Sequence, residues 1–124
     1  MNNQDDLLSK IEKFAKLKKA YRPEAYGFVL ESLDYTVAKL KQPRHVSGEE
    51  LLEGIRGYAV KQYGPMARAV FEHWGVKNTL DFGRIVFDLV EVGLLRKREE
   101  DMIDDFKDRY DFKKAFGSKF EFQD

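Results

Sequence analysis

Residues 47–95 read SGEELLEGIRGYAVKQYGPMARAVFEHWGVKNTLDFGRIVFDLVEVGLL, and this stretch decides the fold of the chain. Its apolar residues recur at helical spacing in three segments, with breaks at Gly64-Pro65 and at Gly75. The last two segments, joined by residues 73–78, are typical of a helix-turn-helix, and residues 92–95 resemble the passage of such a unit into a short strand and wing. We therefore predict a helix-turn-helix or winged-helix-like core over residues 47–95.

Two local signals describe the first helix of this core. Ser47 and Glu50 have the spacing of a capping box, in which each side chain bonds the backbone N–H of the other residue. Gly54 and Gly57 lie inside the same helix, where each glycine costs up to ~1 kcal/mol relative to alanine. We expect another helix to approach closely along the edge that these two glycines share.

Two further helices are predicted on the N-terminal side of the core. Residues 5–20 form an amphipathic helix with lysines on its polar side, and residues 23–41 carry a continuous apolar stripe. Residues 96–124 are densely charged and then aromatic, which fits either a small β wing with a short helix or an extended surface tail. The predicted fold class is mainly α, with one domain of about five helices over residues 1–124.

Composition limits the class of protein. The chain has 124 residues, which suits one domain, and 43% of them are hydrophobic, too many for a disordered chain. Its 22 basic residues balance its 22 acidic residues, whereas a nucleic-acid-binding domain usually carries a basic excess. There is no cysteine, the polar N-terminus does not resemble a signal peptide, and no apolar run reaches the ~20 residues of a membrane span. We expect a cytoplasmic protein without a membrane partner.

Several segments also carry a resemblance to known sequences. They are RPEAYGFVLESLDYT (22–36), RHVSGEELLEGIR (44–56), QYGPMARAVFEHWGV (62–76), DFGRIVFDLVEVGLL (81–95) and DFKDRYDFKKAF (105–116). Together they resemble a family of short bacterial proteins with no established activity. The resemblance covers almost everything after Tyr21 and brings no catalytic residues to this chain.

A helix-turn-helix that reads DNA presents polar side chains of its second helix to the bases and cations to the phosphates. The side of residues 79–91 that helical spacing predicts to be exposed offers three acids and one base: Asp81, Arg84, Asp88 and Glu91. Phosphate would be repelled by this side. The cations that could contact a nucleic acid are Arg84, Arg96, Lys97, Arg98, Lys13 and Lys16. Nucleic-acid binding therefore ranks below a protein contact made by the same scaffold.

No catalytic residue, cofactor site or metal site is assigned from the sequence. One acidic cluster has spacing that would share a helical face and could attract a divalent cation, but it lacks the pattern of a calcium-binding loop. Its members are Asp101, Asp104, Asp105 and Asp108. Charge balance by neighbouring lysines and arginines is the simpler interpretation.

Other residues that could take part in catalysis are isolated in the sequence. His45 and His73 are far apart, and neither Ser47 nor Ser118 lies in a nucleophile motif. The run 81–83 spells Asp-Phe-Gly, the magnesium motif of protein kinases, by chance, because no glycine-rich phosphate loop or catalytic loop accompanies it. We therefore lean against an enzyme.

Ten Phe, six Tyr and one Trp are more aromatic residues than a core of this size must hide. We expect Phe112 and Phe116 to fold back over the helices. For Phe120 and Phe122 two alternatives stay open: they fold back as well, or they contact a protein partner or a second copy of the chain. The leading interpretation is a non-enzymatic binding module that contacts a protein partner. The alternative is a winged-helix-like nucleic-acid binder, and the third is a metal-binding or enzymatic protein.

Overall fold

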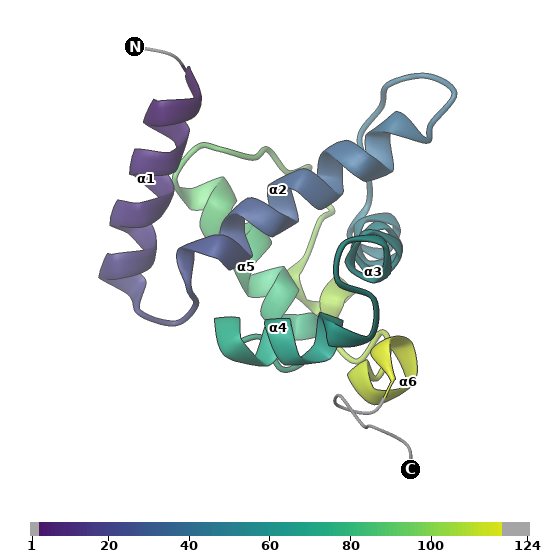
Figure 1. Cartoon of the computed structure of the whole chain (residues 1–124). Helices are drawn as coiled ribbons and strands as arrows, with labels where there is room; N and C mark the ends of the chain where they lie inside the picture. The colour runs from purple at the N-terminus through teal and green to yellow at the C-terminus, as the bar shows by residue number, and fades with distance from the viewer. Residues whose placement is uncertain (1–2, 118–124) are drawn as a thin grey trace.

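The computed structural model describes residues 3–117 and is built from helices (Figure 1). The α-helices are α1 (Asn3–Lys18), α2 (Pro23–Ala38), α3 (Gly48–Tyr63), α4 (Ala67–Trp74), α5 (Thr79–Glu91) and the short α6 (Phe112–Phe116). Two 3-10 turns, η1 (Gly64–Met66) and η2 (Ile103–Phe106), complete the fold. The predicted mainly helical class is confirmed, and the helix ends differ from the expected bounds by a few residues.

Residues 96–117 form loops, the turn η2 and the short helix α6 rather than a β wing, since no strand occurs among the described residues. Three aspartates explain this choice. Asp101 accepts the backbone N–H of Arg98, Asp105 accepts that of Met102 before η2, and Asp111 accepts that of Lys114 as the cap of α6. Side chains that bond nearby backbone groups in this way compete with the ladder that a strand would need. Residues 118–124, with Phe120 and Phe122, lie outside the described part of the chain.

Helix α5 packs against elements from both halves of the chain. It contacts α2, α3 and η2, and α2 crosses it in Figure 1. Its apolar stripe of Phe82, Ile85 and Leu89 is almost fully buried. On another side, Gly83 leaves room for the ring of Phe106, which would lie 2.7 Å from an added Cβ. The glycine is therefore needed for close packing of η2 on α5.

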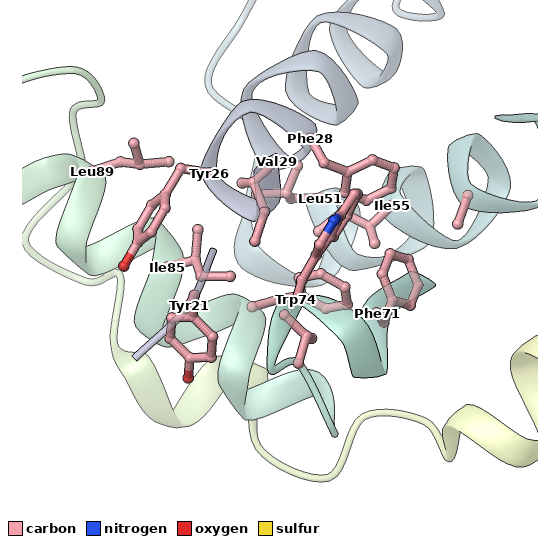
Figure 2. Packing of buried hydrophobic residues seen from close by; sticks show 14 of the residues in the cluster. Tyr21, Tyr26, Phe28, Val29, Leu51, Ile55, Phe71, Trp74, Ile85 and Leu89 are labelled. Atoms are coloured by element: carbon pink, nitrogen blue, oxygen red, sulfur yellow. The ribbon is translucent and has the colours of Figure 1, made fainter. Parts of the chain in front are cut away.

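An aromatic cluster forms the centre of the core. Phe28 of α2 packs on Phe71 and Trp74 of α4, with ring centroids 5.3 Å and 5.5 Å apart, and Figure 2 shows these rings gathered between α2, α3 and α4. Phe112 and Phe116 fold back onto Phe71, at 5.8 Å and 5.2 Å. Both are buried, which confirms the expected fold-back. Aromatic pairs at these distances contribute about 0.5–1.5 kcal/mol beyond the burial of their surface.

Helices α2 and α3 approach each other at the two glycines of α3. A Cβ on Gly54 would overlap the hydroxyl of Thr36, and one on Gly57 would lie 3.4 Å from the hydroxyl of Tyr35. The expected close approach is thereby confirmed, and Gly54 is the tighter of the two positions. The capping box at the start of α3 is also present, with both Ser47–Glu50 hydrogen bonds formed at 3.0 Å and 3.1 Å.

The packing at Gly54 predicts that Gly54→Ala destabilises the protein. An added methyl group would force α2 and α3 apart, and we expect the free energy of unfolding to fall by about 1–3 kcal/mol, measured by urea denaturation followed by circular dichroism. The matched control is Gly27→Ala in α2, where an added Cβ meets no atom within 4 Å. This control should instead stabilise by up to ~1 kcal/mol through helix propensity. Stabilisation by both substitutions would contradict the packing constraint.

The capping box also predicts a pH dependence. Hydrogen bonds from the Arg44 guanidinium and then from the Ser47 backbone N–H lower the pKa of Glu50 from 4.5 to about 2. A lowered folded-state pKa stabilises the fold above the unfolded value, and this contribution is lost as pH falls from 4.5 to about 2. Because the Glu50 side chain is 40% exposed, solvent screening limits its contribution to the free energy of unfolding to about 0.5–1 kcal/mol.

Glu50→Gln should therefore remove this contribution at neutral pH and flatten the loss of stability below pH ~4.5, as measured by urea denaturation across the acid range. Glu99→Gln is a matched control, because Glu99 is exposed and makes no hydrogen bond or ion pair with the described side chains. An acid dependence in Glu50→Gln as steep as that of the original protein would exclude Glu50 as its source.

Candidate functional site

The acidic side of α5 is only partly exposed: the prediction that it faces solvent is wrong for Asp81, which is buried, and holds only in part for Asp88, which is half-buried. The carboxylate of Asp81 accepts hydrogen bonds from the Tyr21 hydroxyl at 2.5 Å and from the Lys77 backbone N–H at 2.8 Å. Asp88 accepts the Tyr26 hydroxyl at 2.8 Å. Helical spacing alone assigns polar residues to the solvent side, but the tyrosine donors allow these carboxylates to be covered by the start of α2.

These contacts make α5 an internal helix. Burial raises the pKa of both Tyr21 and Tyr26, and the neighbouring carboxylates raise it further, so both phenols remain protonated donors. Only Arg84 and Glu91 of α5 are exposed; Arg84 bonds Asp81 at 3.0 Å, and Glu91 pairs with Lys18 of α1 at 3.4 Å. Two isolated side chains, both already paired, do not form a surface for reading base edges.

The predicted cations of α1 line an open concave surface of the protein. Lys13 and Lys16 lie with Lys19 and Arg22 around a groove of about 1010 Å³ between α1, the loop that follows it and the end of α4. We call this surface the α1–α4 groove. Its apolar lining comes from Leu8, Ala15, Ala20, Tyr21, Pro23, Trp74 and Gly75, and its remaining lining residues are Ser9, Glu12, Glu72 and His73. The lysine-bearing side of α1 thus faces a hollow rather than open solvent alone.

Backbone contacts fix the base of the α1–α4 groove. The backbone N–H of Arg22 donates to the carbonyl of Trp74 at 3.1 Å, which ties the α1–α2 loop to the end of α4. Gly75 takes a left-handed φ of 88° there, and an added Cβ would lie 3.0 Å from the carbonyl oxygen of Ala20. The sequence break at Gly75 therefore serves both to end α4 and to admit the loop.

The predicted cations after α5 belong to a different site. Arg96 and Lys97 line a smaller cavity of about 190 Å³, together with His45 and Asp101. Its apolar walls come from α2, α3, α5, η2 and the adjoining loops; they are Leu33, Val37, Val46, Leu51, Val86, Phe87, Leu95 and Phe106. Its other polar lining residues are Arg44, Ser47, Gly48 and Asp105. We call this the His45 cavity. Arg98 is exposed in the loop beside it.

His45 and Asp101 come together although 55 residues separate them in sequence. The imidazole Nε2 lies 2.8 Å from the Asp101 carboxylate, within ion-pair distance, yet the geometry does not satisfy a hydrogen bond from the ring N–H. We interpret the contact as electrostatic, because an aligned ring N–H is required for a true hydrogen bond. Sequence reasoning missed this pair, since only the tertiary fold brings the two segments together.

The remaining predicted groups are dispersed. The acidic cluster does not share one helical face, because Asp101 precedes η2 and Asp108 follows it with a left-handed φ of 51°. Within the described residues, no three histidine or acidic side chains are placed to hold a metal ion. Asp81 of the Asp-Phe-Gly run is engaged by Tyr21, as described above. His73 lines the α1–α4 groove, far in sequence from His45, and Ser118 lies outside the described residues.

Among the described residues, no helix has both the length and the apolar character needed to cross a membrane. Comparison of the chain with protein-family models, with curated proteins and with solved structures finds no match. The resemblance to short bacterial proteins of unestablished activity therefore stays a prediction. What the protein does must be inferred from the α1–α4 groove, the His45 cavity and the charges around them.

Proposed function

We propose that this protein is a non-enzymatic binding module that holds an acidic segment of a protein partner in the α1–α4 groove. The observation that carries the proposal is that three lysine side chains of the groove are unpaired among the described residues. The ammonium groups of Lys13, Lys16 and Lys19 line the groove and form no ion pair or hydrogen bond with any described residue. Charges left unpaired in one concavity provide electrostatic complementarity for a partner of opposite sign.

Two of the other charges of the groove are already engaged, whereas Glu12 lines the groove without an ion pair among the described residues. Arg22 pairs with Glu24 at 3.5 Å, and Glu72 pairs with Arg68 of α4 at 3.8 Å. The unpaired lysines therefore dominate the potential in the groove, although the whole chain carries no net charge. Clefts lined by one sign of charge raise the local concentration of oppositely charged partners.

Apolar surface in the groove favours a protein segment over a purely ionic ligand. Leu8 is 49% exposed, and the groove also includes Ala20 and Pro23. An amphipathic helix that places apolar residues in the groove and carboxylates beside the lysines would satisfy both features. Charged side chains at the edge of a binding surface, such as these lysines, mainly set the rate of association and its dependence on salt concentration.

Nucleic-acid binding is the second candidate, because the same three lysines could contact phosphates. The remaining predicted cations do not join them. Arg84 is paired with Asp81, and Arg96 and Lys97 line the separate His45 cavity. The internal position of α5 also removes the usual base-reading helix of a helix-turn-helix. The protein-partner proposal therefore fits the geometry better.

A binding experiment on the full chain tests the proposal. The probe is a labelled amphipathic peptide with leucine on one face and glutamate on the other, compared with the same peptide carrying glutamine. We expect the glutamate peptide to bind more tightly, with an affinity that falls as salt is added. Substituting Lys13→Glu, Lys16→Glu and Lys19→Glu together should weaken binding at least about tenfold, because three exposed ion pairs contribute ~0.2–1 kcal/mol each.

The matched control reverses the same amount of charge elsewhere, with Lys107→Glu, Lys113→Glu and Lys114→Glu, and should retain most of the affinity. Equal loss in the two triple variants would show that only net charge matters and would exclude the groove. A short DNA duplex is titrated in parallel. Tighter binding of the duplex than of the peptide, lost only in the Lys13, Lys16 and Lys19 variant, would favour the nucleic-acid alternative.

A further inference from the structure

We propose that His73 makes binding in the α1–α4 groove depend on pH, with the acidic segment held more tightly once the imidazole is protonated. This inference rests on the proposed function, because it concerns the same groove and the same class of partner. Three observations carry it: the place of His73 in the groove that the lysines line, the absence of a partner for its ring among the described residues, and the constant charge of the groups around it.

Backbone contacts place His73 beside the loop that follows α1. It is the last residue but one of α4, and it lines the groove together with the three unpaired lysines. The carbonyl of the next residue, Trp74, accepts the backbone N–H of Arg22 at 3.1 Å, and Gly75 lies against the carbonyl oxygen of Ala20. A positive charge on the imidazole therefore adds to the potential that the lysines create in the same concavity.

The ring of His73 is available to a partner. Helix α4 buries Ala67, Phe71 and Trp74 in the core, whereas the His73 side chain is exposed. It forms no hydrogen bond or ion pair with any described residue. A protonated imidazole has two N–H donors and a positive charge, and both suit a carboxylate acceptor.

The other groups of the groove keep their charge where histidine changes its own. Histidine titrates between about pH 5 and pH 8, whereas lysine and arginine stay protonated and glutamate stays ionised over most of this range. Burial, and then the hydrogen bond to Asp81, raise the pKa of Tyr21, so its hydroxyl stays neutral. The charged and titratable groups that share the groove with His73 are Glu12, Lys13, Lys16, Lys19, Tyr21, Arg22 and Glu72.

The two carboxylates of the groove do not cancel the lysines. Glu72 pairs with Arg68 at 3.8 Å, and Glu12, without an ion pair among the described residues, offsets one of the three lysines. The groove is therefore positive while His73 is neutral, and protonation adds one further positive charge. Because an acidic partner binds the protonated form better, its affinity rises as pH falls through the range in which histidine titrates.

The experiment measures the affinity of the full chain for the glutamate peptide at about pH 5.5 and about pH 7.5, with the ionic strength held constant. We expect binding about two- to fivefold tighter at the lower pH, the effect of adding one exposed ion pair. The glutamine peptide presents no carboxylate to the groove and should bind equally at the two pH values.

Substitutions identify the histidine responsible. His73→Gln should remove the pH dependence and keep the affinity that the original protein has at the higher pH. His73→Lys should bind at both pH values as tightly as the original protein does at the lower one, which a purely structural role for His73 would not produce. The chain contains one other histidine, which lines the separate His45 cavity, so His45→Gln is the matched control and should keep the full pH dependence.

Two results would overturn this inference alone. The affinity of the original protein could be the same at both pH values, or His73→Gln could keep the pH dependence. Either result leaves the proposed function intact when the glutamate peptide still binds and its affinity still falls with added salt. Failure of the glutamate peptide to bind at either pH would overturn both proposals, so the two failures are distinguishable.

Discussion

Two hydrogen bonds, from Tyr21 to Asp81 and from Tyr26 to Asp88, hold the first turn of α2 and the loop before it against α5. Hydrogen bonds to charged groups typically contribute about 1.5–3 kcal/mol, and leaving such a buried carboxylate unpaired costs more than the bond itself contributes. With the carboxylates covered, α5 packs on several sides at once. The helix that would read DNA in a helix-turn-helix instead packs against α2, α3 and η2 in this protein.

Helix α2 lines both the α1–α4 groove and the His45 cavity. Its first residue, Pro23, lines the α1–α4 groove, whereas Leu33 and Val37 in its second half line the His45 cavity. The tight contact between Thr36 and Gly54 sets the position of α2 against α3 near that cavity. The net charge of zero conceals one local excess, because three lysines without an ion pair among the described residues gather in the α1–α4 groove.

Much of the fold follows from local patterns in the sequence. The apolar stripes, the capping box at Ser47 and the close approach at Gly54 depend on residues a few positions apart, so helical geometry predicts them. The cations Lys13, Lys16, Arg96 and Lys97 could also be named as candidates. Their division between a groove and a cavity could not, because it depends on where α4 and the segment after α5 come to lie.

By itself, the sequence determined the helical class, the main helix boundaries and the close approach of another helix at Gly54 and Gly57, since each is encoded in hydrophobic period, capping chemistry or glycine spacing. That this helix is α2 was decided by the tertiary structure. Only the tertiary structure decided which polar residues are buried. Asp81 and Asp88 lie on the polar side of α5, yet tyrosines some 60 residues away supply their donors. The pairing of His45 with Asp101 has the same origin, because a contact between distant segments depends on the packing of every helix between them.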